Sequence, residues 1–191
     1  MVIAILGWGS LIWNPTSLEI EKENQENKWH IEGPVLPIEF SRISFDGRLT
    51  LVIDNNNGTP VQTLYCISKF KELDKAVLNL ATREGSGINK IGFYNRDTVD
   101  FNPINFKFQQ NILDWINKKN IDAVIWTNLS PSFKDKTGKQ FNKENVIGYL
   151  NNLTMEVRTK AEEYIKRTPL QIKTKMRIEI ESALGWKAFS P

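Results

Sequence analysis

The sequence has few of the residues that cross-link chains or bind transition metals. It contains one cysteine, Cys66, and one histidine, His30. A single cysteine cannot form an intrachain disulfide, and the usual structural zinc site needs a set of cysteine and histidine ligands. A metal held by carboxylates alone stays open, although no calcium-loop spacing is present.

Long apolar runs and blocks of like charge are also missing. The first apolar run extends only from Val2 to Leu6, which is too short for a signal peptide or a membrane span. The 25 lysines and arginines are spread among 22 aspartates and glutamates, which gives a net charge of +3. Without a basic cluster, the sequence does not indicate nucleic-acid binding. We expect a cytoplasmic protein whose partners include neither a membrane nor a nucleic acid.

The pattern along the chain predicts an α+β fold. A length of 191 residues with 40% hydrophobic residues is enough to bury one substantial core. The dipeptide Asp46-Gly47 predicts a hairpin turn between two strands. The expected strands cover 2–6, 38–45, 48–54, 61–67, 91–95 and 122–127, and the expected helices cover 70–83, 106–119, 143–166 and 170–184.

The first predicted strand leads directly into a glycine-flanked loop, Gly7-Trp8-Gly9-Ser10-Leu11. Glycines allow a sharp turn and a close approach to a ligand, and successive backbone N–H groups can hold an anion. The loop lacks the third glycine of a dinucleotide fingerprint and the Gly-Lys-Ser/Thr of a phosphate loop. Ser10 also lacks the flanking glycines of a nucleophile elbow, and His30 is the one imidazole base available. A plain tight turn and a carboxylate-binding turn both stay open.

Glu84 extends the apolar stripe of the helix predicted over 70–83, which Gly85 is expected to end. The stripe consists of Leu73, Val77 and Leu80. Helical spacing directs Glu84 inward, at a helix C-terminus, where both the macrodipole and burial raise a carboxyl pKa. A raised pKa suits a general acid or base at neutral pH. Two simpler interpretations stay open: a frayed end with Glu84 in solvent, or a local pair with Arg83 or Lys90.

Together, these two features resemble motifs of the γ-glutamylcyclotransferase family. The segment from Leu6 to Asn14 is similar to the motif at that family's first strand, which in glutathione-specific members has the sequence Tyr-Gly-Ser-Leu-Ile-Trp. The segment from Leu80 to Gly85 resembles the Arg-Glu segment that carries the family's catalytic glutamate. The similarity covers about residues 2–127 and is concentrated at the two motifs, and Trp8 stands where the family usually has tyrosine.

The resemblance implies a mixed, closed or partly closed β-barrel over residues 1–135, with a C-terminal helical extension over 142–185 packed on or beside it. It also implies an enzyme that cleaves a γ-glutamyl amine or peptide. The substrate's α-amine attacks its γ-carbonyl and gives 5-oxoproline, without a cofactor or metal. Glu84 is then the expected catalytic residue. The expected substrate-binding residues are Gly7, Trp8, Gly9, Ser10 and Leu11.

Other functions stay open beside this one. A non-catalytic domain with the same pocket would bind a small carboxylate or a protein without turnover. An interaction module would act through the helical tail, which could also join subunits. An inward glutamate at position 84 favours the enzyme, because a simple carboxylate binder gains nothing from an acid beside an anionic ligand.

Cys66 lies in an apolar strand and is expected to be a buried thiol rather than a nucleophile.

Overall fold

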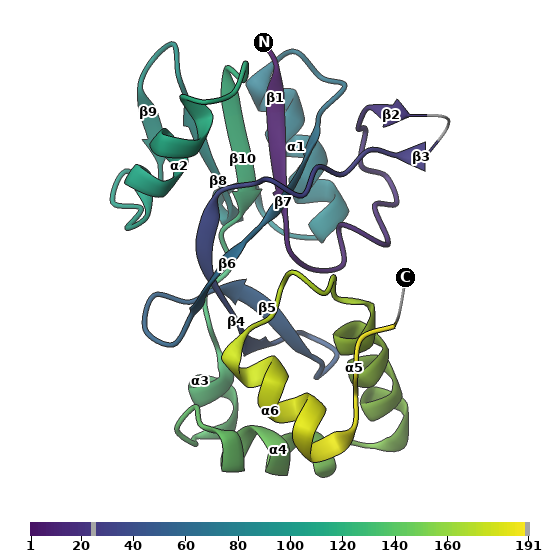
Figure 1. Cartoon of the computed structure of the whole chain (residues 1–191). Helices are drawn as coiled ribbons and strands as arrows, with labels where there is room; N and C mark the ends of the chain where they lie inside the picture. The colour runs from purple at the N-terminus through teal and green to yellow at the C-terminus, as the bar shows by residue number, and fades with distance from the viewer. Residues whose placement is uncertain (24–25, 190–191) are drawn as a thin grey trace. The chain divides into compact units, whose positions relative to one another are not determined.

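A computed structural model of the chain describes residues 1–23 and 26–189 (Figure 1). The chain divides into two compact units, and each unit is assembled from separate segments of the sequence. The first unit contains residues 1–7, 14–36 and 62–129. The second contains residues 8–13, 37–61 and 130–191.

The first unit is built on a five-stranded mixed sheet with the strand order β7-β1-β10-β8-β9. The bounds of these strands are Ile3–Gly7 for β1, Leu64–Ile67 for β7, Ile91–Asn95 for β8, Asp100–Asn102 for β9 and Ala123–Thr127 for β10. β1 lies parallel to β10 and antiparallel to β7. Every residue of β1 is buried, so the predicted buried first strand is confirmed.

Two helices accompany this sheet. Helix α1, Leu73–Glu84, packs against β8 and β10 and ends as predicted at Gly85, whose φ of 60° is left-handed. Helix α2, Gln109–Ile116, is shorter than predicted, and the indole of Trp115 donates to the carbonyl of Glu32 at 2.7 Å. The remaining elements of this unit are β2, Lys22–Glu23, β3, Glu26–Asn27, and the 3-10 turn η1, Ile88–Lys90.

The second unit contains most of a three-stranded sheet with the order β5-β4-β6. The bounds are Val35–Ile43 for β4, Leu49–Ile53 for β5 and Thr59–Gln62 for β6. The predicted hairpin at Asp46-Gly47 is confirmed, because β4 and β5 pair antiparallel around it. The N–H of Ser44 donates to the carbonyl of Arg48 at 2.9 Å, and Gly47 has a φ of 86°.

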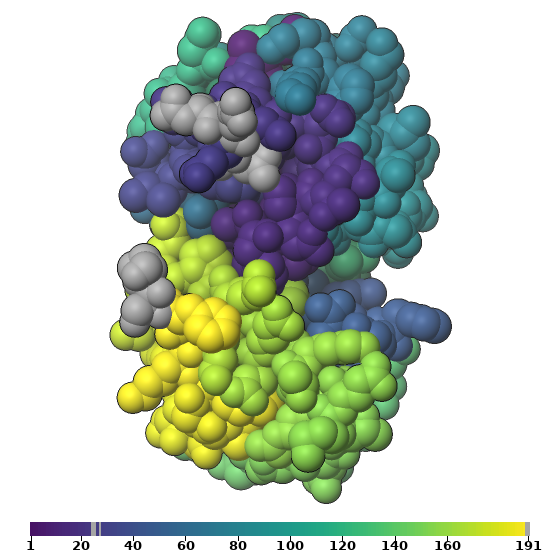
Figure 2. Space-filling view, turned by 90° about the vertical axis from the view of Figure 1, so that its right-hand side faces the viewer, coloured from purple at the N-terminus to yellow at the C-terminus, as the bar shows by residue number. Residues whose placement is uncertain are grey.

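The C-terminal part of the second unit is helical. The bounds are Phe133–Thr137 for α3, Lys143–Asn151 for α4, Met155–Arg167 for α5 and Lys175–Leu184 for α6. α4 contacts both α5 and α6, and these helices form much of the surface of this unit in the view of Figure 2. The helix predicted over 143–166 is interrupted, because Thr154 caps the start of α5. No helix in the described part of the chain is long and apolar enough to cross a bilayer.

The mixed α+β composition is confirmed, but the predicted closed or partly closed β-barrel is wrong. A barrel requires the two edge strands of a sheet to pair with each other. The larger sheet instead ends at β7 and β9, the smaller ends at β5 and β6, and no sheet within residues 1–23 and 26–189 closes.

The structure departs from the predicted barrel at Thr63. The single strand predicted over 61–67 divides at Thr63 into β6 and β7, which belong to different sheets. Thr63 is fully buried, and its N–H and hydroxyl both donate to the carbonyl of Pro34, at 3.1 Å and 2.8 Å. These bonds take the residue out of both strand ladders, so the chain leaves one sheet and enters the other.

A buried carboxylate joins β4 to the start of α6 within the second unit. Glu39 is 1% exposed. One oxygen accepts from the N–H of Phe40 at 2.9 Å and from the hydroxyl of Thr174, the N-cap of α6. The other accepts from the hydroxyl of Thr59 at 3.0 Å and the N–H of Met176 at 3.3 Å. Burial raises the pKa of Glu39 although all these donors oppose it.

We expect Glu39→Gln to lower the free energy of unfolding by about 1–3 kcal/mol. Each carboxylate oxygen accepts one backbone N–H, from Phe40 or from Met176, so the glutamine NH₂ leaves one of them without an acceptor in either orientation. Urea denaturation measures the loss. Glu156→Gln, which changes an exposed pair with Lys160, is the matched control and should leave stability nearly unchanged. Equal losses in both variants would contradict a special role for Glu39.

Candidate functional site

Glu84 occupies the last turn of α1, in the first unit. Helical spacing puts it on the face that carries Leu80, which is fully buried. The Glu84 side chain is only 16% exposed. Its predicted inward direction and partial burial are therefore confirmed, and the interpretation of a frayed end facing solvent is wrong.

Arg83 holds the Glu84 carboxylate in place. Its Nη1 donates to Glu84 Oε1 at 2.6 Å, and its Nη2 donates to the carbonyl of Asn14 at 2.6 Å. The Arg83 side chain is 10% exposed, so this ion pair is shielded from water more than a surface pair is. The local pair with Arg83 that the sequence left open is thus formed. Because the guanidinium is also fixed to the backbone of Asn14, the carboxylate has a defined position.

Burial is the main influence on the acidity of Glu84, and it raises the pKa of that carboxyl. The charge of Arg83 and its hydrogen bond lower the pKa, but the balance remains a raised value. This is the direction predicted from the position of Glu84 in the helix. A raised carboxyl pKa brings proton exchange closer to neutral pH, as a general acid or base requires.

The glycine-flanked loop begins where β1 ends. Gly7 pairs with Leu64 of β7 in the first unit, and residues 8–13 belong to the second unit. The N–H of Ile12 donates to the carbonyl of Gly9 at 3.0 Å, which closes a four-residue turn. The predicted tight turn is therefore confirmed, whereas its binding of a carboxylate stays a prediction.

The side chains of this loop differ in exposure. Trp8 and Leu11 are 4% and 5% exposed, whereas Ser10 is only partly buried. Trp8 and Leu11 thus act through packing, which fixes the course of the loop. If a ligand binds here, Ser10 and the backbone N–H groups are the groups best placed to meet it.

Position 9 requires a glycine because its backbone lies close to another side chain, and not because of its φ angle. Its φ is not in the left-handed region, but a Cβ at this position would overlap the hydroxyl oxygen of Tyr164 on α5. The same hydroxyl accepts a long hydrogen bond from the N–H of Leu51 at 3.4 Å, and the Tyr164 ring meets Trp13 edge-on at 5.3 Å. The group that Gly9 approaches is therefore a side chain of the C-terminal extension.

Tyr164 is absent from the residues that the sequence predicts for the site. A signal for its burial was present, because Ala161 and Ile165 mark an apolar helical face and position 164 lies on the same face. The helical spacing of apolar residues shows that this face is buried, but it does not show which other element packs on it. A contact between α5 and a loop that begins at residue 8 is therefore visible only in the folded chain.

The structure divides the predicted site residues between the two units. Gly7 and Glu84 belong to the first unit. The residues in the second unit are Trp8, Gly9, Ser10 and Leu11. Within the first unit, Arg83 connects Glu84 to the backbone of Asn14. Within the second unit, Gly9 lies against Tyr164.

Cys66 is buried in β7, as predicted, and burial raises the pKa of its thiol. A thiol of raised pKa is a poor nucleophile at neutral pH. In the described ranges, no three His, Cys, Asp or Glu side chains gather in an arrangement that could hold a metal ion.

Comparisons of the chain with models of protein families, with curated proteins and with solved structures found no match. The resemblance to γ-glutamylcyclotransferases therefore rests on the two sequence motifs, and the roles that it implies stay predictions.

We expect Gly9→Ala to lower the free energy of unfolding by about 1–3 kcal/mol, because the added methyl overlaps the Tyr164 hydroxyl. In a Tyr164→Phe background the nearest remaining atom is ring Cζ at 3.4 Å, so most of the cost should disappear. Urea denaturation of the four proteins gives the coupling energy. Additive losses would show that Tyr164 does not restrict position 9.

Proposed function

We propose that this protein is a γ-glutamylcyclotransferase that acts on a γ-glutamyl amine or peptide. The substrate's α-amine attacks its γ-carbonyl carbon, the bond from that carbon to the leaving nitrogen breaks, and the products are 5-oxoproline and a free amine. The observation that carries the proposal is the Glu84 carboxyl, 16% exposed with its pKa raised by burial, within the motif that resembles the family's catalytic segment.

Glu84 is assigned both proton transfers. An α-amine has a pKa of about 8, so most of the amine is protonated at neutral pH. The amine must lose a proton before it attacks. Glu84 takes that proton and returns it to the leaving nitrogen. Burial favours the second transfer because it raises the pKa of Glu84, while Arg83 opposes that rise and so favours the ionised form that the first transfer needs.

The loop that follows β1 is assigned to the substrate. The N–H groups of Gly9, Ser10 and Leu11 would hold the α-carboxylate or the oxyanion that forms at the γ-carbonyl. The closed turn between Gly9 and Ile12 supports this assignment, since it fixes the direction of the intervening backbone. Ring closure is intramolecular, so holding a folded conformer of the substrate supplies much of the acceleration. Neither a metal nor a cofactor takes part.

We further propose that the protein acts in the cytoplasm and that its partner is a small molecule rather than a nucleic acid. Opposite charges are interspersed along the chain, with 25 basic and 22 acidic residues, so no single-sign surface is indicated. Nothing in the proposed chemistry requires an oxidising compartment.

The experiment that tests the function is a product assay. The purified protein is incubated with γ-glutamyl amines, γ-glutamyl dipeptides and glutathione, and 5-oxoproline is measured by mass spectrometry. We expect product from the native chain and a loss of about 100-fold or more in kcat/KM for Glu84→Gln. Glu72→Gln, which alters an exposed pair with Lys75 beside the same helix, is the matched control and should retain activity.

Two results of that assay would contradict the proposal. No product from any of these compounds would contradict the reaction and favour a non-catalytic domain that binds a small carboxylate. Equal product from the native chain and Glu84→Gln would support the reaction but show that Glu84 does not catalyse it.

Replacing Arg83 should change the pH dependence of the reaction. Arg83 lowers the pKa of Glu84, so Arg83→Met lets burial raise it further. Glu84 must be ionised to accept a proton, and kcat/KM therefore rises with pH through the pKa of this group. We expect the acidic limb of the kcat/KM profile to move to higher pH in Arg83→Met, and to move less in Arg83→Lys. A limb that stays in place in both variants would show that Arg83 does not control the titrating group.

A further inference from the structure

Tyr164 of α5 lies against the glycine-flanked loop at two points. Its hydroxyl oxygen is so close to Gly9 that a Cβ there would overlap it, and its ring meets the Trp13 ring edge-on at 5.3 Å. Ser10 lies between these two contacts along the chain and is partly exposed, so the loop is open to solvent at this residue. One buried side chain therefore touches the loop on both sides of an accessible residue.

Tyr164 is itself held by the β4–β5 hairpin. The residue is 7% exposed, and the Phe40 ring of β4 meets its ring edge-on at 6.3 Å. The Arg48 guanidinium carbon lies 5.7 Å from the centroid of the same ring. The N–H of Leu51 in β5 donates to the hydroxyl at 3.4 Å. A side chain confined in this way has little freedom to move, so it can fix the position of the backbone that it touches.

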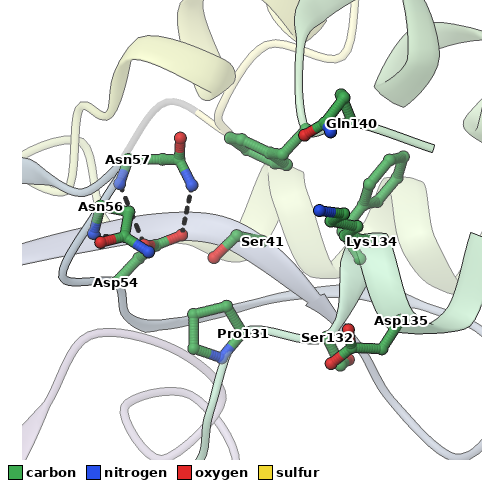
Figure 3. Close-up of a pocket in the computed structure, with 11 residues that line it drawn as sticks. Ser41, Asp54, Asn56, Asn57, Pro131, Ser132, Lys134, Asp135 and Gln140 are labelled. Carbon is green, nitrogen blue, oxygen red and sulfur yellow. Dashed lines mark hydrogen bonds between the residues drawn. The ribbon is translucent and has the colours of Figure 1, made fainter. Parts of the chain in front are cut away.

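Strand β5, which carries Leu51, is fixed at both ends. A tight hairpin joins its start to β4. At its end, Asp54 closes the next turn, because its Oδ1 accepts from the N–H groups of Asn56 and Asn57 at 2.9 Å and 3.0 Å (Figure 3). The Tyr164 hydroxyl therefore bonds to a strand whose backbone is held in place.

The fit at Gly9 depends on the hydroxyl of Tyr164. A Cβ on residue 9 would meet two atoms within 4 Å, the hydroxyl oxygen and ring Cζ, and the distance to Cζ is an ordinary 3.4 Å. The loop turns at the same residue, since the carbonyl of Gly9 accepts from the N–H of Ile12 at 3.0 Å. Removing the hydroxyl thus leaves a gap beside this turn that a methyl group on residue 9 would largely fill.

We propose that Tyr164 is a positioning residue of the substrate loop, whose hydroxyl sets the backbone N–H groups around Ser10 for the substrate's α-carboxylate. The inference rests on the proposed function, because it concerns the same loop and substrate. Tyr164 acts through the backbone of the loop and does not touch the substrate. An α-carboxylate is charged before and during the reaction, so a displaced loop weakens the ground state and the transition state alike. Such a loss raises KM and leaves kcat nearly unchanged.

Two phenylalanine variants test this role with the γ-glutamyl compound that the native chain converts fastest. Tyr164→Phe keeps the ring beside Trp13, and we expect KM to rise about 5- to 10-fold while kcat changes less than about 2-fold. Tyr149→Phe is the matched control in the same unit, since it removes a hydroxyl that donates to the carbonyl of Gly47 at 2.6 Å. It should lower the Tm and keep the native KM. Adding Gly9→Ala to Tyr164→Phe should recover most of the KM.

Amide hydrogen exchange of the full-length protein without substrate tests the same contact independently of turnover. The exchange rate of the Ile12 N–H is compared with that of the Asp54 N–H, which bonds to the carbonyl of Pro37, so that changes in global stability cancel. We expect this ratio to rise about 5-fold or more in Tyr164→Phe and to stay at the native value in Tyr149→Phe.

The outcomes separate this inference from the proposed function. No product from the native chain contradicts the function, and the role of Tyr164 in substrate binding falls with it. Product together with a native KM or a native exchange ratio in Tyr164→Phe overturns the role of Tyr164 alone. A fall in kcat without a change in KM, or an equal rise in KM in Tyr149→Phe, also overturns it.

Discussion

A carboxyl group taken out of water must receive donors from the protein, and this constraint shapes both units of the chain. Glu39 receives four donors and thereby joins β4 to α6. Asp54 receives amides of the turn that follows β5. At Glu84 the contributions that oppose burial come from Arg83, its neighbour in the same helix. A carboxyl balanced in this way by one side chain is well suited to exchange a proton.

Local features of the fold follow from the sequence because they depend on local chemistry. The buried first strand, the hairpin at Asp46-Gly47 and the end of α1 at Gly85 are each determined by a few adjacent residues. Strand pairing is different, since periodicity does not show which sheet a strand joins. The break at Thr63 depends on its bonds to Pro34, 29 positions earlier, and the expected barrel fails there.

The same distinction applies to the candidate site. The burial of Glu84 and the direction of its pKa follow from helical spacing, and the structure has both. The contact of Gly9 with Tyr164 joins two segments far apart in the sequence, so it depends on how the chain folds. Helix α5 of the C-terminal part thus contributes a side chain that lies against the glycine-flanked loop.

The most direct test of the account is the titration of the Glu84 carboxyl itself. The ¹³C chemical shift of its carboxyl carbon, assigned by comparison with Glu84→Gln, can be followed against pH in the full-length protein. The account predicts an apparent pKa above the ordinary glutamate value of about 4.3. A pKa at or below that value would show that Arg83 outweighs burial, and it would contradict the assignment of Glu84 as the group that moves the proton.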